Sequence, residues 1–225
     1  VVIKHGGRVV TASCPAGPAF EGGLISYGMP GCDGAIEAVR YRDGKFDLET
    51  IGGVKPEGIC GSGLIDILAE LRRHDQMTPK GVFADRKREL TISEESGITF
   101  SREDASNLAQ AKAANFCGQY IVLRHLGIGP GDVDKLYLAG AFANYVNVRN
   151  AIEIGFLAPV PEERIVKVGN ASARGSLQLL LSSRMRAVAE SFVKEIEHVE
   201  LETTPDFFEI FVEACQCKPM PGELT

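Results

Sequence analysis

The sequence predicts a layered α/β fold, in which helices pack against a mixed sheet. Two observations support this fold class. Strand-like apolar segments alternate with segments of helical period along most of the 225 residues. In two places, at residues 134–154 and 164–199, a strand-like run is followed by a glycine turn and then a helix. Glycine is also concentrated near the start, where 14 of the 25 glycines lie within positions 1–63, so tightly shaped loops are expected there.

The first 51 residues contain two predicted β-hairpins separated by a long loop. Residues 1–10 place two β-branched runs around a Gly-Gly pair, which is typical of a tight turn. Residues 13–34 are rich in glycine, proline and small residues, so we expect a shaped loop with one short helical turn at 24–27. Strands at 35–42 and 45–51 then flank Asp43 and Gly44, a dipeptide that favours a two-residue hairpin turn.

A helix is expected over residues 63–74, because apolar residues recur there on one helical face and Ser62 is a suitable N-cap. These apolar residues are Leu64, Ile65, Leu68 and Leu71. The charged segment 79–97 contains strand-like runs at 81–84 and 89–92, which predict a peripheral hairpin.

Two further helices are expected in the second half of the chain. A capping box at residues 101–104 predicts the start of a long helix that ends at Gly127 and packs on a sheet. After a buried strand at 134–139 and a turn at 140–145, Asn147 is expected to cap a short helix that stops at Gly155.

The last 62 residues are expected to begin with a strand at 164–168 and a turn at Gly169 and Asn170. A long amphipathic helix follows at about 171–199, and its apolar face is expected to point inward. This face comprises Leu177, Leu181, Val188, Phe192 and Ile196. A short strand at 201–202 and a helix at 207–212 complete the prediction.

The charge and hydropathy of the chain exclude several classes of partner. A formal net charge of −6 and a pI near 5.3 argue against general electrostatic attraction to nucleic acid or acidic lipid. No apolar run reaches the roughly 18 residues that a membrane-spanning helix needs, and no basic-then-apolar leader opens the sequence. We therefore expect a soluble, cytoplasmic protein with no nucleic-acid or membrane partner.

The cysteines are expected to be free thiols without a metal. There are six, too few for a secreted disulfide scaffold, and their spacings match no zinc pattern. Cys215 and Cys217 form the one close pair, but two thiols cannot complete a four-ligand site by themselves.

Four glycine-bearing segments are candidate binding sites. One of them, residues 169–175, is a turn between a strand and a helix in which Asn170 or Ser172 could simply be the helix cap. Residues 140–144 follow a strand and precede a helix, which is where open α/β sheets bind ligands. The alternative, that Gly140 only permits a tight turn, is equally consistent with the sequence. Residues 58–63 precede a helix whose free amides suit an anion, or they form a glycine-rich start packed closely on a strand. Glu21 lies among glycines, where its carboxylate could bind Mg²⁺ or position a water, although a solvated loop glutamate is commoner.

Five motifs, taken in order, resemble the C-terminal region of the reductive activators of corrinoid proteins. That family belongs to the acetate and sugar kinase, Hsc70 and actin (ASKHA) superfamily. The motifs are TASCPAGPAFEGG at 11–23, GICGSGLID at 58–66, LAGAFANY at 138–145, GFLAP at 155–159 and VGNAS at 168–172. The resemblance extends over about residues 1–211 and implies an actin/Hsc70-like (ribonuclease H-like) fold, a mixed sheet with flanking helices.

The resemblance also implies an activity. Family members use ATP to reduce an inactive cob(II)alamin, bound to a partner corrinoid protein of a methyltransferase system, to cob(I)alamin. Their iron–sulfur cluster lies in an N-terminal domain, and their C-terminal region takes ATP or ADP with Mg²⁺. A homodimer is expected as well.

The matched motifs assign candidate residues by similarity. The adenosine motif corresponds to Gly140, Ala141, Phe142 and Asn144. The glycine-rich helix start on the other side of the nucleotide corresponds to Gly61, Ser62 and Gly63. The first motif supplies Gly17 and Gly22 for cofactor binding and Glu21 as the candidate catalytic carboxylate.

The chain departs from the family pattern at the phosphate loops. The family's two phosphate loops are Asp-x-Gly hairpins, whereas Asp-Gly occurs here only at 33–34 and 43–44, in other contexts. We therefore expect residues 1–225 to be a C-terminal ASKHA ATPase-like lobe, truncated at its N-terminus, with 79–97 as a peripheral insertion. We also expect that it does not hydrolyse ATP by itself.

Three alternatives remain open. The chain could be a lobe of an ASKHA small-molecule kinase, with Glu21 as the base. It could instead be a non-catalytic module for corrinoid-protein docking or dimerisation. Finally, Cys60 stands where related dehydratase activators place a cluster-binding cysteine at a dimer interface, or it is a buried inert thiol.

Overall fold

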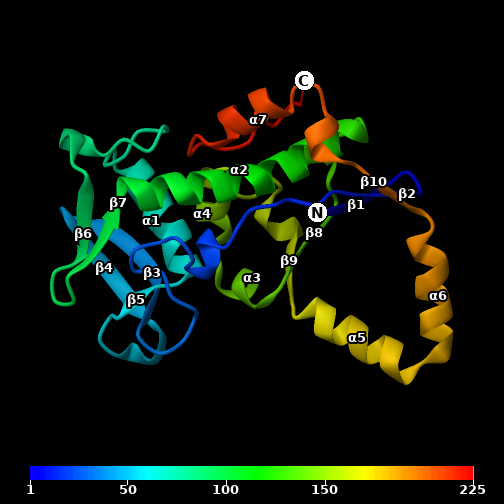
Figure 1. Cartoon of the computed structure of the whole chain (residues 1–225), viewed down its shortest axis with the longest axis horizontal. Coiled ribbons are helices and arrows are strands. Elements are labelled where there is room, and N and C mark those ends of the chain that lie inside the picture. Colours follow the sequence, from blue (N-terminus) through cyan, green and yellow to red (C-terminus); the bar gives the residue numbers. More distant parts are fainter. Residues whose placement is uncertain (225) are drawn as a thin grey trace.

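One long helix, α2 (Arg102–His125), runs through the middle of the molecule and packs against both of its hydrophobic cores (Figure 1). The computed structural model describes residues 1–224. Within them the strands form four small sheets, not one continuous sheet, and the helices pack between and around these. The α/β class with mixed pairing is therefore confirmed.

The first core lies around the N-terminal half of α2. Its main sheet has the order β4-β3-β5, with the α1 helix against β3 and the β6-β7 hairpin beside α2. The elements are β3 (Ala35–Arg42), β4 (Lys45–Thr50), β5 (Gly58–Ile59), α1 (Gly61–Arg73), β6 (Glu89–Ser93), β7 (Ile98–Ser101) and α4 (Val148–Glu153).

The second core lies around the C-terminal half of α2. There α7 packs along α2, and a second small sheet has the order β1-β2-β10, with β10 parallel to β2. The elements are β1 (Val2–His5), β2 (Arg8–Thr11), β10 (Ile196–His198) and α7 (Phe207–Ala214). Residues from the two ends of the chain thus share one core.

A parallel pair of strands carries the later glycine turns. The β8 strand (Leu136–Ala139) pairs with β9 (Ile165–Gly169), and the single helical turn α3 (Ala141–Tyr145) follows β8 directly. We expected a buried strand at 134–139 and a non-helical turn at 140–145. The strand is instead half-exposed, with Tyr137 61% accessible, because Leu136 and Leu138 face the cores while the alternate side chains point to the uncovered face.

The segment that follows β9 projects away from the rest of the molecule (Figure 1). The prediction of one helix over 171–199 is wrong: α5 (Ala171–Leu181) ends at Ser182, whose backbone is extended, and α6 (Ser183–Val193) begins there. The expected inward face is largely exposed, because no core lies beside this arm. Its accessible side chains include Leu177 (55%), Leu181 (76%), Val188 (53%) and Phe192 (44%).

Several local predictions hold. The hairpin turns lie at Gly6-Gly7 and at Asp43-Gly44, where all four residues adopt positive φ. Ser101 and Asp104 form the expected capping box of α2. Asn147 caps α4, and the helix at 207–212 corresponds to α7.

Other local predictions are corrected. The short helix expected at 24–27 lies instead at Ala19–Glu21 as a 3-10 turn, because Leu24 has a positive φ of 63°. The run at 81–84 forms no strand, since Phe83 only bridges Met77, and β6 pairs with β7. The 201–202 segment is a 3-10 turn, Leu201–Thr203.

The segment 79–97 is anchored by apolar side chains. Phe83 and Ile92 are buried in the first core, and Phe83 lies 6.1 Å from the ring of Phe100. Within residues 1–224 no helix is both long and apolar enough to cross a membrane.

Candidate functional site

Three of the motifs meet in a cluster of aromatic rings. Phe20 lies 6.2 Å from Phe142 and 5.0 Å from Phe156, and Phe142 and Phe156 are 6.0 Å apart between ring centroids. Two amide side chains of α2 hold the backbone of Phe156, because Asn115 and Gln119 both donate to its carbonyl oxygen, at 2.6 and 2.9 Å. The loop at 17–23, α3 and the segment after α4 are thereby held together. Sequence reasoning did not single out Phe156, although it lies in the GFLAP motif.

The glycine-rich start of α1 forms the buried base of this cluster. A Cβ on Gly61 would lie 2.4 Å from the Phe20 carbonyl oxygen and 2.6 Å from Cε2 of Phe142. A Cβ on Gly63 would lie 2.3 Å from the carbonyl oxygen of Ile36. Both glycines therefore permit close packing, which is the second of the two roles considered for residues 58–63.

Ser62 lies inside the first turn of α1. The predicted N-cap role is wrong: the cap is Cys60, whose carbonyl accepts the Leu64 amide at 2.9 Å, so the helix begins two residues earlier than expected. Ser62 is 3% exposed, and its hydroxyl lies 3.3 Å from the Cys60 thiol. The helix starts early because Gly61 and Gly63 allow the first turn to pack directly against Phe20, Phe142 and β3.

Gly140 differs from these glycines because its surroundings are open. It has φ 107° and ψ 161°, a conformation that L side chains rarely adopt, and no atom lies within 4 Å of where its Cβ would be. Its amide donates to the Gly169 carbonyl at 2.8 Å. Ala141 and Asn144 are exposed, whereas Phe142 is half-buried. This turn therefore presents backbone and small side chains to an accessible surface.

The turn after β9 lies against the turn after β8. A Cβ on Gly169 would be 3.7 Å from Nδ2 of Asn144, and the side chain of Asn170 accepts the Ala173 amide at 2.9 Å to cap α5. Lys167 donates to the carbonyls of Asn144 and Val146, at 2.9 and 2.8 Å, and so supports the C-terminal end of α3. Lys167 was not a candidate, and no sequence pattern marked it.

The first motif divides into a buried and an exposed part. Phe20 is buried, but Glu21 and Gly17 are exposed, and Glu21 has no side-chain partner among the described residues. Gly22 has φ 92°, and its Cβ would lie 2.6 Å from the Met29 amide nitrogen. The loop is thus shaped by close backbone packing, with Glu21 left in solvent.

A cavity of about 810 Å³ lies beside this cluster. It is lined mainly by β1, by residues 132–139, by Asn115, Gln119 and Leu123 of α2, and by apolar residues of 156–160. Of the candidate site residues only Phe142 lines it. The cavity therefore reaches the Gly140 turn through Ala139, Phe142 and Ala143, whereas Gly140, Ala141 and Asn144 do not line it.

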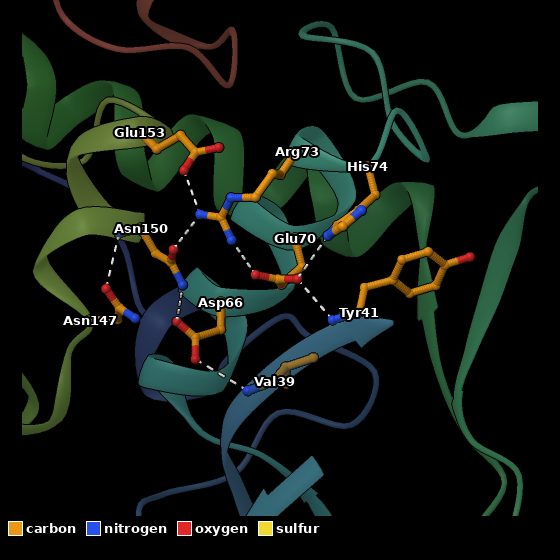
Figure 2. Close-up of polar contacts among 9 residues, drawn as sticks. All are labelled: Val39, Tyr41, Asp66, Glu70, Arg73, His74, Asn147, Asn150 and Glu153. Carbon is orange, nitrogen blue, oxygen red and sulfur yellow. Dashed lines mark hydrogen bonds and ion pairs between the residues drawn. The ribbon is translucent and has the colours of Figure 1, made fainter. Parts of the chain in front are cut away.

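A buried network of polar side chains lies between α1 and α4 (Figure 2). Asp66 accepts hydrogen bonds from the Val39 amide at 3.2 Å and from Nδ2 of Asn150 at 2.6 Å. Burial raises the pKa of the Asp66 carboxyl, and the hydrogen bonds from Asn150 and Val39 oppose that shift. Glu70 accepts the Tyr41 amide at 2.8 Å.

Arg73 completes this network. It forms an ion pair with Glu70 and another with Glu153, and it donates to Oδ1 of Asn150 at 2.6 Å. Asp66, Glu70 and Asn150 are each 5 to 6% exposed. Of these residues only Asp66 lies in one of the sequence motifs, GICGSGLID, and the sequence does not show that they meet, because they are far apart in the chain.

The cysteines differ in their burial. Cys60 and Cys217 are buried, and all six are free thiols. Burial raises the pKa of Cys215 and Cys217, and raises that of Cys117 to about 12. A raised pKa keeps these three thiols protonated near neutral pH, and a protonated thiol is a poor nucleophile. In the described part of the chain, no three histidine, cysteine or acidic side chains are grouped so as to hold a metal ion.

Comparison with known proteins gives consistent matches over nearly the whole chain. Residues 1–223 match the family described as the C-terminal domain of RACo, the ASKHA domain. The "Corrinoid activation enzyme RamQ" of Eubacterium limosum is 29% identical over 236 residues, covering 94% of this chain and 40% of that protein. The "[Co(II) methylated amine-specific corrinoid protein] reductase" of Methanosarcina barkeri is also 29% identical, covering 92% and 42%.

A solved structure agrees with these matches. The "Reductive activator for corrinoid,iron-sulfur protein" superposes with a TM-score of 0.87 and 33% sequence identity, over 97% of this chain and 38% of that one. The chain thus spans about two fifths of the length of the relatives it matches.

Proposed function

Because the chain belongs to the family of C-terminal ASKHA domains of reductive activators of corrinoid proteins, we propose that it is the nucleotide-binding part of such an activator. In the proposed reaction, one electron reduces cob(II)alamin on a corrinoid protein of a methyltransferase system to cob(I)alamin. The iron–sulfur domain expected in the parent protein supplies the electron. ATP binding and hydrolysis drive the conformational change that makes this difficult reduction possible.

The geometry of the Gly140 turn carries the proposal. The turn combines a glycine-only backbone conformation, open space at the Cβ position and direct contact with the Gly169 turn. A nucleoside needs such close access to backbone groups. Its ring and ribose would lie against residues 140–144, with Asn144 and Asn170 offering amide groups at the edge.

The described residues suit the nucleoside end of ATP better than its phosphates. Within residues 1–224 no three histidine, cysteine or acidic side chains are grouped so as to hold a metal ion, and Glu21 has an exposed carboxylate. When bound, the nucleotide supplies the phosphoryl group whose hydrolysis drives the cycle. This chain's own part, in the proposal, is to bind and orient the nucleoside.

Calorimetric titration of the chain with ADP tests the proposal. The wild type should release or absorb heat with a single-site isotherm, and Gly140→Ala should weaken binding by at least about tenfold, since a side chain there is strained and fills the open space. Gly175→Ala, at a helical glycine with nothing within 4 Å of its Cβ position, is the matched control and should bind as the wild type. Equal affinity of wild type and Gly140→Ala would contradict the assignment of this turn.

A parallel titration with a purified corrinoid protein separates the remaining alternative. Heat with the corrinoid protein but none with ADP would instead favour a docking module. The kinase alternative gains no support from the geometry, because a catalytic base must face its substrate and Glu21 is exposed on the loop after Phe20.

A further inference from the structure

Two carboxylates of α1, those of Asp66 and Glu70, accept hydrogen bonds along the edge of β3 where a neighbouring strand would otherwise pair. On β3 the amides of Val39 and Tyr41 point to the edge opposite β4, and β5 pairs only with Ala35 and Ile36. Asp66 and Glu70 accept these two amides. The spacing of the two carboxylates along α1 matches the spacing of the two amides along β3, because four helical residues advance about 6 Å and two strand residues about 6.6 Å. The helix α1 is thereby fixed in register along β3.

The same network links α1 to α4. Asn150 uses both ends of its amide, because Nδ2 donates to Asp66 and Oδ1 accepts from Arg73 (Figure 2). Asn150 is 5% exposed, so water cannot replace either partner freely. Its backbone amide is held by Asn147, the N-cap of α4, at 3.2 Å.

Contacts near both ends attach the segment 140–153 to α1, in addition to the bonds that Arg73 makes to Asn150 and Glu153. Near its start, the ring of Phe142 packs on Gly61, and near its end Asn150 bonds to Asp66. Between these contacts lies the exposed turn with Gly140 and Asn144. Since β3 fixes α1, the position of the turn is set by a chain of contacts that begins at the sheet.

We propose that Asn150 and Asp66 are positioning residues for the nucleotide: by joining α4 to α1 they hold the Gly140 turn in its binding conformation. This inference rests on the proposed function. Both residues are buried and do not contact the ligand. Their proposed role is to keep the exposed turn in its binding conformation before the nucleotide arrives, which lowers the free-energy cost of ordering the turn on binding.

The hydrogen-bond pattern gives a sharp genetic test. In Asn150→Asp, a second carboxylate faces Asp66 and the donor between them is lost. In Asp66→Asn, the new amide must still accept the Val39 amide, so its NH₂ group points at the NH₂ group of Asn150. The double variant Asp66→Asn/Asn150→Asp restores every pairing, since the amide at 66 donates to the carboxylate at 150, which also accepts from Arg73.

Two measurements on the 225-residue chain compare the single and double variants with the wild type. ADP affinity by calorimetry should fall about tenfold or more in each single variant and return to within about threefold of the wild type in the double variant. Hydrogen exchange of the amides at 141–147, without nucleotide, should accelerate in the single variants and recover in the double one.

A matched control separates positioning from general destabilisation. Ser101→Ala removes the cap of α2 and lowers overall stability, but it touches neither α1 nor α4. It should leave both the ADP affinity and the exchange at 141–147 unchanged under native conditions.

The outcomes distinguish this inference from the proposed function. If the wild type binds ADP and the single variants bind equally well, the positioning role is overturned and the proposed function stands. If the wild type binds no ADP, the proposed function fails and the inference about the nucleotide fails with it. Unchanged exchange at 141–147 in both single variants would overturn the structural link itself.

Discussion

Individual glycines in the candidate site serve different physical purposes. Gly63 is needed for space, because a Cβ there would lie 2.3 Å from a backbone oxygen that cannot move aside. Gly140 is needed for its positive φ. The sequence shows both only as glycines in glycine-rich motifs, so it could locate them but not tell the two purposes apart.

This difference predicts the effect of Gly63→Ala. Forcing a methyl group against the Ile36 carbonyl should lower the free energy of unfolding by about 1–3 kcal/mol, as overpacking does. Urea unfolding measures it. Gly175→Ala should do the reverse and add about 0.5–1 kcal/mol, since this glycine lies in an exposed helix with open space around it. Equal stability of Gly63→Ala and wild type would contradict the packing argument.

The buried carboxyl of Asp66 predicts a dependence of stability on pH. Its folded-state pKa is raised by burial, so the folded protein holds this proton more tightly than the unfolded chain. The contribution of Asp66 to stability is therefore complete below 3.8, the ordinary pKa of a solvated aspartate, and is lost as the pH rises through the higher folded-state pKa.

Unfolding of wild type and Asp66→Asn over a pH series measures this effect. The difference in free energy of unfolding, wild type minus variant, should fall as the pH rises from below 3.8. If this difference in free energy of unfolding rises over the same pH range, the hydrogen bonds from Val39 and Asn150 affect the pKa of Asp66 more strongly than burial does.

At the scale of elements, helix caps separate packed helices from the projecting arm. Ser101 caps α2, whose inner face is buried, whereas Ser182 caps α6, in which no residue is buried. Each serine accepts an amide of the helix it begins, from Asp104 at 3.0 Å and from Met185 at 3.2 Å.

The two caps should therefore respond differently to alanine. Ser101→Ala should lower the global free energy of unfolding by about 1 kcal/mol. Ser182→Ala should instead increase local fraying of α6, seen as faster hydrogen exchange at 183–193, with little change in global stability. A global loss as large as that of Ser101→Ala would show that α6 unfolds together with the cores.

The exposed leucines of α5 predict that apolar side chains can be replaced there at no cost. Leu180 and Leu181 are 75% and 76% accessible. Leu180→Glu/Leu181→Glu should change the free energy of unfolding by no more than about 0.5 kcal/mol, whereas Leu68→Ala, in the first core, should cost about 2–5 kcal/mol. A loss above about 1 kcal/mol in the double variant would mean that these leucines are covered in solution.

The whole molecule brings three motifs together but offers few groups for phosphate chemistry. Phe20, Phe142 and Phe156 join the motifs, yet Glu21 is solvent-exposed and, within residues 1–224, no three histidine, cysteine or acidic side chains are grouped so as to hold a metal ion. We therefore predict that the purified chain does not hydrolyse ATP. A phosphate-release assay should give the rate of the buffer alone. Turnover that Gly140→Ala abolishes would contradict this prediction.

The cores also depend on contacts between distant parts of the chain. Lys112, fully buried in α2, donates to the carbonyls of Ala214 and Gln216 and so holds the end of α7. Burial lowers the pKa of this lysine. The sequence placed Lys112 in a helix but carried no sign that its charge would lie inside, because the partners are more than 100 residues away.

The sequence by itself determined the local features of this protein. The positive-φ turns at Gly6-Gly7 and Asp43-Gly44, the caps at Ser101, Asn147 and Asn170, and the order of the family motifs all follow from residues within a few positions of one another. Such interactions depend on short-range sterics and hydrogen bonds, which a sequence specifies directly.

Only the tertiary structure decided which surfaces are buried. The apolar stripe at 171–199 predicts a core-facing helix, but the chain breaks at Ser182 and leaves that stripe exposed. Conversely, Asp66 and Asn150 look like surface residues in the sequence and are buried against each other. Burial depends on which distant segments come to lie alongside, and hydrophobic period alone does not contain that information.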